Sequence, residues 1–198
     1  PNGCPASGYR RIPAATSLRA NHFPFTGQSM SYEKYYDDGQ LWKKGTKKDG
    51  EWDGLYEEYL PNGRLKLKGT VKDGERDGPW ELYNEDGQLR TEETYRDGKL
   101  DGPSVVYAYY DIGQLRSKVT LKDGESDGPY EWYYQNGQLQ TKATYVAGQL
   151  DGPIELYNEN GQLLSKGTLN MGHKCGVWLE SGQTVTYDPC PPGLEDGN

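Results

Sequence analysis

Few residues in this 198-residue chain have the types and spacing needed for chemistry. His173 lies two positions before Cys175, but zinc sites in proteins use three or four protein ligands, so this pair does not complete one. The other histidine, His22, is distant in sequence. No combination of serine, histidine and acid, or of cysteine and histidine, is typical of a nucleophilic enzyme. We therefore expect a binding protein with no catalytic residues, no metal and no cofactor.

Acidic residues suggest two further kinds of chemistry. The Lys-Asp-Gly-Glu segments at 48–51, 72–75 and 122–125 lack the spaced oxygen ligands and closing glutamate of a calcium loop. A pair of glutamates could act as acid and base, but only with an apolar pocket that raises one pKa. Most of the recurring glutamates are instead expected to face lysines. We interpret both features as structural.

Composition limits the kind of partner. The formal net charge is -8, whereas nucleic acids and anionic membranes favour basic patches. No apolar run approaches the ~18 residues of a membrane-spanning helix. Hydrophobic residues make up only 33% of the chain, but 17 Tyr and 5 Trp argue against disorder, because disordered chains are poor in aromatic residues. The sequence predicts a folded protein that binds neither nucleic acid nor membranes.

The sequence consists largely of internal repeats. A Gly-Gln-Leu type element recurs with spacings of 24, 24, 26, 24 and 24 residues, and its glycines are Gly39, Gly63, Gly87, Gly113, Gly137 and Gly161. A separate Asp-Gly element follows the same spacing, at Asp53, Asp77, Asp101, Asp127 and Asp151. Both elements include the same two-residue insertion in the fourth copy. Two independent markers therefore define six repeats.

Each repeat reads as a β-hairpin. Two stretches rich in Tyr, Trp, Leu and Thr flank an Asn-Gly or Asp-Gly pair, which is typical of a type I′ turn. No segment is long enough for a helix before the next glycine. The prediction is an all-β fold, an elongated antiparallel β-hairpin solenoid of twelve strands in one layer. Residues 1–27 are a non-repeat segment, 28–180 the six repeats, and 181–198 a C-terminal cap and tail.

A two-residue turn at Asp86-Gly87 fixes the register. Glu81 then faces Glu92, and Tyr83 faces Arg90. The same rule places glutamate opposite lysine in four other copies: Glu33–Lys44, Glu57–Lys68, Glu131–Lys142 and Glu155–Lys166. Exposed pairs of this kind contribute about a few tenths of a kcal/mol each.

Alternation assigns the two faces of the sheet. Trp80, Leu82 and Tyr95 share the apolar face with residues that recur in the other copies: Tyr32, Tyr56, Tyr130, Ile154 and Trp178, and a leucine column of Leu41, Leu65, Leu89, Leu115, Leu139 and Leu163. The opposite face carries a tyrosine column, interpreted mainly as packing residues: Tyr35, Tyr59, Tyr83, Tyr107, Tyr133 and Tyr157.

The stretch "DGPWELYNEDGQLRTEETYRDGKLDG" (residues 77–102) resembles the variant MORN repeat of bacterial YwqK-type antitoxins. The likeness covers about residues 28–180. It implies a hairpin solenoid that binds and neutralises a cognate toxin, as an immunity protein does, including toxins of the phospholipase type delivered by type VI secretion. The fourth copy departs from the pattern, with Ser104 and Val105 in place of Trp and Glu.

That departure marks the expected partner site. Repeating columns serve the scaffold, so specificity is expected where the repeat is broken. We place the two extra residues in the turn between Tyr107 and Gly113, and expect Tyr107, Tyr109, Tyr110, Asp111 and Ile112 to contact the partner, because tyrosine is a frequent interface anchor. Glu131 is expected to steer a basic partner. The alternative is that this loop packs on its own sheet.

The oxidation state of the cysteines depends on the cellular compartment in which the protein is found. A Ser181-Gly182 turn would place Cys175 opposite Asp188, within reach of Cys190, so a Cys175–Cys190 disulfide is predicted. A disulfide favours an oxidising compartment such as the periplasm, whereas three free thiols, Cys4 included, would indicate the cytoplasm.

Two other functions remain open. "PYEWYYQNGQL" (residues 129–139) resembles the choline-binding repeats of cell-wall proteins, which suggests a carbohydrate or cell-wall binding module, but those repeats are shorter. A structural scaffold without a single partner is the third possibility.

Overall fold

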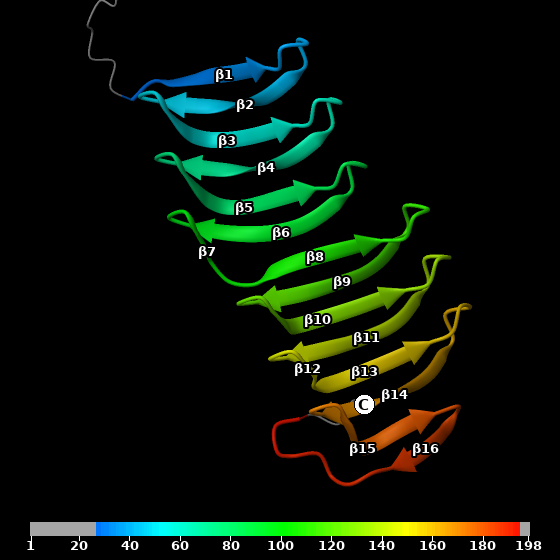
Figure 1. The fold of residues 1–198 in the computed structure, drawn as a ribbon. Helices are drawn as coiled ribbons and strands as arrows, with labels where there is room; N and C mark the ends of the chain where they lie inside the picture. Colours follow the sequence, from blue (N-terminus) through cyan, green and yellow to red (C-terminus); the bar gives the residue numbers. More distant parts are fainter. Residues whose placement is uncertain (1–26, 195–198) are drawn as a thin grey trace, which may run out of the picture.

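The computed structural model describes residues 27–194, which form one antiparallel sheet in which each long strand pairs with the next along the chain (Figure 1). The predicted all-β hairpin solenoid is confirmed. The strands are β1 (Ser29–Tyr35), β2 (Leu41–Lys48), β3 (Glu51–Tyr59), β4 (Leu65–Lys72), β5 (Glu75–Tyr83), β6 (Leu89–Arg96), β7 (Lys99–Leu100), β8 (Ser104–Tyr109), β9 (Leu115–Lys122), β10 (Glu125–Tyr133), β11 (Leu139–Val146), β12 (Gln149–Leu150), β13 (Gly152–Tyr157), β14 (Leu163–Asn170), β15 (His173–Glu180) and β16 (Gln183–Thr186). The twelve expected strands are thus joined by the hairpin β15–β16 and the short strands β7 and β12, giving sixteen within residues 27–194.

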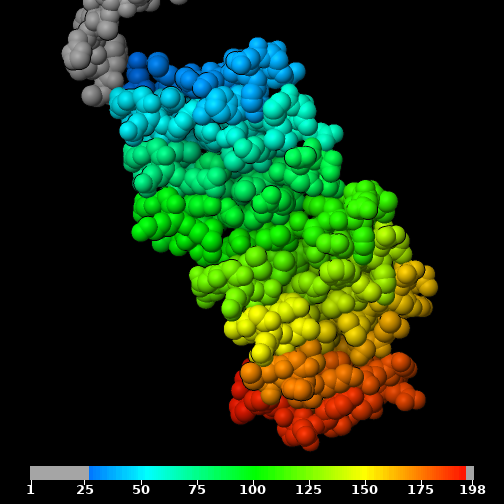
Figure 2. All heavy atoms as spheres, viewed as in Figure 1, coloured from blue at the N-terminus to red at the C-terminus, as the bar shows by residue number. Residues whose placement is uncertain are grey.

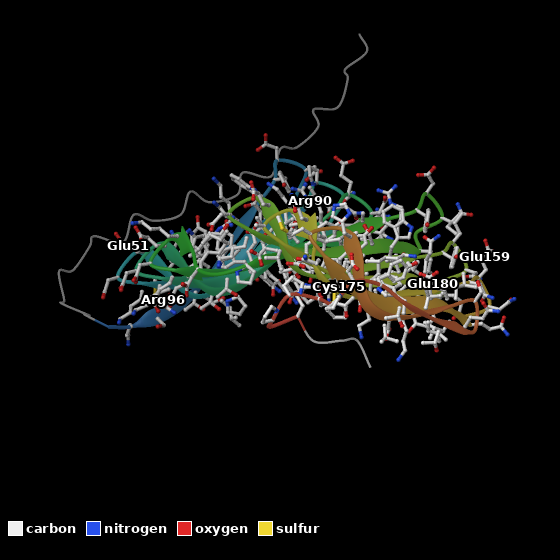
Figure 3. The ribbon with its side chains drawn as sticks, turned by 90° about the horizontal axis from the view of Figure 1, so that it is seen from below. Glu51, Arg90, Arg96, Glu159, Cys175 and Glu180 are labelled. Atoms are coloured by element: carbon white, nitrogen blue, oxygen red, sulfur yellow. A yellow bond between two sulfur atoms is a disulfide. The ribbon has the colours of Figure 1, made fainter. Side chains whose placement is uncertain are left out.

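The molecule is elongated (Figures 1 and 2), and its described strands form one sheet. Fourteen strands follow one another in sheet order, so a strand spacing of ~4.8 Å gives a length of roughly 60 Å. Seen along the stack, side chains project from both faces (Figure 3). No helix among the described residues is long and apolar enough to cross a membrane.

The hairpins use two kinds of turn, and the predicted type I′ turn at Asp86-Gly87 is wrong. Gly87 has a φ of 83°, but Asp86 is not in the positive-φ region. The Asn84 side chain instead accepts hydrogen bonds from the amides of Asp86 (3.0 Å) and Gln88 (2.9 Å), which stabilises a wider loop. The type I′ turns lie at the opposite ends of the strands, where they join one repeat to the next. Both of their central residues have positive φ, as at Asp73-Gly74 (49° and 83°).

The predicted strand register is confirmed away from this loop. Glu81 faces Glu92, whereas Tyr83 faces Leu89 instead of Arg90 because the register shifts by one residue at the loop. The glutamate–lysine pairs of the other hairpins also face each other.

The facing glutamates and lysines form a row of charges across the sheet. Two ion pairs in this row join neighbouring hairpins. Lys44 Nζ lies 3.0 Å from Glu57 and Lys68 Nζ lies 2.9 Å from Glu81, and in both cases the glutamate belongs to the following repeat. The charges therefore help to hold one repeat on the next.

The insertion in the fourth repeat lies elsewhere than predicted. The loop before Gly113 has the same bonds as the others, Tyr110 N to Gln114 O (2.9 Å) and Gly113 N to Tyr110 O (2.8 Å), so the turn is not lengthened. The two extra residues lengthen the start of the hairpin instead. Val106 pairs with Thr91 on one side and with Val119 on the other.

This arrangement displaces the second half of the array along the strands. On the side of β6, Val106 pairs with the preceding strand as Leu82 does in the third repeat. On the side of β9, Val106 pairs with the following strand as Trp80 does in the third repeat. The difference is two residues, or about 7 Å, and Figure 1 shows the step between β6 and β8. An even number of residues keeps every side chain on its own face.

The core consists of two aromatic clusters, one on each side of this step. The first contains Leu67, Val71 and Trp80, and the second Ala143, Ile154, Leu169 and Trp178. A Cβ added to Gly69 would overlap the indole of Trp80, and one added to Gly167 would overlap that of Trp178. Each indole thus packs on bare backbone. The expected place of the leucine column on this face is wrong: the register shift at each loop sets Leu89 opposite Tyr83, and the other leucines of the column likewise face tyrosines and belong to neither cluster.

The last hairpin closes the C-terminal end. Val177 faces Thr186 across the Ser181-Gly182 turn, as the register predicts. A disulfide joins Cys175 to Cys190 and holds the following chain against β15. Trp178 is 2% exposed, and its indole N–H donates to the carbonyl of Cys175 (3.0 Å). Cys4 and His22 lie outside the described residues.

The fit between glycine and tryptophan yields the first prediction. Gly69→Ala is expected to lower the free energy of unfolding by about 1–3 kcal/mol, because a methyl group enters space that the indole fills. The fifth and sixth repeats place Ala143 and Ile154, which belong to one core cluster, at the positions of Gly69 and Trp80. Adding Trp80→Ile to Gly69→Ala should therefore cost less than the sum of the single changes, as measured by denaturant unfolding. Strictly additive losses would show that the two side chains do not share this space.

The disulfide yields the second prediction. Cys175 and Cys190 are 15 residues apart, and closing a loop of this size stabilises a protein by about 3 kcal/mol. Replacing both cysteines by serine should lower the unfolding free energy by about that amount. Intact mass after alkylation without reductant should show no modification at either cysteine; alkylation of all three thiols in the chain would contradict the bond.

Candidate functional site

The fourth repeat differs from the others in its tyrosines. Counted from the turn glycine, Tyr107 occupies the position of Glu81, and Tyr109 that of Tyr83. Tyr109, not Tyr107, is therefore the member of the tyrosine column in this repeat. A phenol replaces a carboxylate in the row of charges.

In the five other repeats, the tyrosine hydroxyl donates to the glutamate two residues earlier on the same strand, as in Tyr133 to Glu131 (2.7 Å) and Tyr157 to Glu155 (2.6 Å). In the third repeat the hydrogen bond from Tyr83 and the nearby Lys68 lower the pKa of Glu81. These units keep the recurring tyrosines and glutamates bonded to each other.

The fourth repeat breaks this unit. The Tyr107 hydroxyl crosses to the preceding repeat and donates to Glu92 (2.6 Å), and that of Tyr109 donates to the carbonyl of Leu89 (2.7 Å). Partial burial and the bond to Glu92 raise the pKa of Tyr107, and burial raises that of Tyr109. Both phenols are thus held in the un-ionised form against the first half of β6.

A hollow of about 510 Å³ opens at this place. It lies beside the step, where the loop of the fourth hairpin extends past the loop of the third. Its lining comes from both repeats: Asn84, Asp86, Gln88 and Arg90, and Tyr107, Ala108, Tyr109, Tyr110, Asp111, Ile112 and Gly113. The Gln88 side chain donates to the carbonyl of Gly113 (2.8 Å) and ties the two loops together.

The predicted site residues fall into three groups. Tyr107, Tyr109, Tyr110, Asp111 and Ile112 all line this hollow. Tyr110 also has a scaffold role, since its hydroxyl donates to the carbonyl of Tyr133 (2.7 Å), as that of Tyr36 does to Tyr59 in the first repeat. Glu131 does not line the hollow: it lies on β10 opposite Lys118, which itself faces Tyr107.

Sequence reasoning missed the contribution of the third repeat. Asn84, Asp86, Gln88 and Arg90 belong to the preceding loop, and they reach the hollow because the step sets the two loops at different levels. Aligning the fourth repeat with the third on the turn glycines Gly113 and Gly87 places the two extra residues at the start of the fourth hairpin. That alignment is the sequence signal for a step between the third and fourth repeats.

The lining has the composition of a protein-recognition surface. Ile112 is 71% exposed at the tip of the loop, where the other repeats carry asparagine or aspartate. Around it stand aromatic rings, amide groups, the carboxylates of Asp86 and Asp111, and the guanidinium of Arg90. Within residues 27–194 no group of three or more His, Cys, Asp or Glu side chains could hold a metal ion. Apolar and aromatic side chains with a polar rim are typical of a protein interface.

Comparison with protein-family models gives four matches to the MORN repeat variant, at residues 52–73, 76–97, 126–147 and 150–170. The chain contains MORN repeats. The matched MORN segments leave out residues 98–125, which hold the fourth repeat, so the sequence departs from the family pattern where the structure has its step. A search of curated proteins found no similar sequence.

The tyrosines of the MORN array yield the third prediction, a loss of stability in alkali. Burial and the bond to Glu131 raise the pKa of Tyr133 from 10.0 to about 12. The folded protein therefore holds this proton more tightly than the unfolded chain does. The resulting stabilisation is complete below pH 10 and is lost as the pH rises through 12.

Denaturant unfolding across this pH range measures the effect, and Tyr133→Phe should reduce the pH dependence. If tyrosinate absorbance showed every tyrosine of the folded protein titrating at its ordinary pKa, the tyrosine–glutamate units would not exist in solution.

Proposed function

We propose that this MORN-repeat protein is an immunity protein that neutralises a cognate bacterial toxin by binding it directly. The observation that supports this most is the coincidence of the hollow of about 510 Å³ with the break in the repeat. The regular repeats supply a long, rigid support, and the fourth repeat supplies a surface that no other repeat reproduces.

The hollow offers what a protein partner needs for a specific contact. Ile112 can enter a pocket of the partner, and the rings of Tyr107 and Tyr109 offer large contact area with little loss of conformational entropy. Both hydroxyls are already bonded within the array, so the rings are held in position before the partner arrives. A preorganised surface binds more tightly because less order has to be imposed on binding.

The toxin is proposed to be a secreted enzyme of the type VI, phospholipase class, met in the periplasm. The Cys175–Cys190 bond favours this compartment, because disulfides persist where the surroundings are oxidising. The net charge of -8 favours a toxin with a basic surface, and Glu131 and the two aspartates of the hollow would steer it toward the site.

The proposed function is tested by co-expressing this chain with the product of the neighbouring gene. If that product is the toxin, it arrests growth alone, is tolerated with the immunity protein, and co-purifies with it. A neighbouring product whose toxicity is unaffected by this chain would overturn the pairing.

The fourth prediction separates the hollow from the rest of the array. Ile112→Asn restores the residue type found at this position in the other repeats, so it removes the apolar tip without disturbing the turn. It should weaken toxin binding by about 2 kcal/mol, as measured by calorimetric titration, and leave the melting temperature unchanged.

Asn160→Asp, at the same position of the sixth repeat, is the matched control and should bind as the unmodified chain does. Alanine at Tyr109 and Tyr110 is a poorer probe, because it also removes two bonds between strands. Equal affinity of the Ile112→Asn variant and the control would exclude the hollow as the toxin site.

A further inference from the structure

The two ends of the sheet are unlike. At the C-terminal end, β16 is four residues long, and the disulfide holds the chain that follows it against β15. At the N-terminal end, β1 has seven residues, all of them exposed, and β2 is its one pairing partner among residues 27–194. Figure 1 shows β1 as the first strand of the stack. An unpaired strand edge presents a row of N–H and C=O groups that another strand can bind.

The row of charges is incomplete at this edge. Glu57, Glu131 and Glu155 each face a lysine on both neighbouring strands, and the lysines are Lys44, Lys68, Lys118, Lys142 and Lys166. Glu33 faces Lys44 on one side, and on its other side no residue of the part of the chain that the structure describes is paired with it. A cation opposite Glu33 would complete the pattern that the interior of the sheet repeats.

The neighbouring position asks for a small residue. Tyr56 faces a glycine on each side, Gly45 and Gly69. Tyr32, its counterpart on β1, faces Gly45 on one side and is 37% exposed. A hollow of about 200 Å³ lined by Met30, Tyr32 and Lys47, among others, opens beside it on the same edge.

We propose that the free edge of β1 binds an extended segment of a partner protein as an added antiparallel strand. The segment carries lysine or arginine opposite Glu33 and glycine or alanine opposite Tyr32. Main-chain hydrogen bonds supply the affinity and these two side-chain positions the specificity, as in other cases of strand addition. This site is separate from the hollow of the fourth repeat and does not depend on the toxin being the partner.

The chain itself provides a probe of the right chemistry. In strand β4, Lys68 faces Glu81 and Gly69 faces Trp80, the counterparts of Glu33 and Tyr32. A fluorescent peptide with the sequence of residues 63–74 should bind the full chain in an anisotropy titration. The same peptide with Lys68→Glu should bind at least tenfold more weakly, and Glu33→Lys in the protein should reverse the preference. Absence of binding, or equal binding of the two peptides, would overturn the proposal.

Amide hydrogen exchange locates the peptide. In the free full chain, the amides of β1 should exchange faster than those of β5, and they should slow when the peptide is added. If the β1 amides were already as protected as those of β5 in the free chain, the edge would be occupied by the chain's own residues or by a second copy, and the proposal would be wrong.

Discussion

The packing of a tryptophan ring on the bare backbone of a glycine is the contact on which this sheet depends. A single-layer sheet has no second layer to cover its apolar face, so the face must bury its side chains against itself. Trp80 does this by lying on Gly69, with the Arg76 guanidinium 4.2 Å from its ring centroid on the same strand. Trp178, Gly167 and Lys174 repeat the arrangement at the other end, where Lys174 Nζ lies 4.7 Å from the ring. Such close packing leaves no room for a side chain at the glycine.

The same constraint explains where the array changes. In the step between the third and fourth repeats, Glu93 stands at the position of Gly69, and Ser104 at that of Trp80. A glutamate removes the surface on which an indole lies, and a serine removes the indole, so both halves of the contact are lost together. Two added residues then displace the following strands, and the loops of the third and fourth hairpins no longer stand level. The hollow is the consequence of this displacement, which links a change in the core to a surface suited to a partner.

Much of this fold follows from the position of its glycines. Two sets of glycine markers with one spacing predict the six repeat hairpins, their antiparallel order and the residues that face each other, and Glu81 opposite Glu92 is an example. The turn type could not be predicted from the Asp-Gly pair, because that pair forms a type I′ turn at Asp73-Gly74 and a wider loop at Asp86-Gly87, where the Asn84 side chain bonds the loop amides. The insertion was misplaced for a related reason: its length is visible in the sequence, but its position depends on which neighbouring strand sets the register. The lining of the hollow by Arg90 and Gln88 is a property of two repeats together, and no single repeat carries a signal for it.

We propose that a partner recognises the place where the repeat is broken. Photo-crosslinking from single positions tests it most directly, because the six repeats supply equivalent positions on equivalent loops. A photoreactive residue at Ile112 is compared with the same residue at Asn62 and Asn160, which occupy the same loop position in the second and sixth repeats. A covalent adduct with the cognate partner is expected from position 112, and little from positions 62 and 160. Adducts of equal or greater yield from 62 or 160 would contradict it.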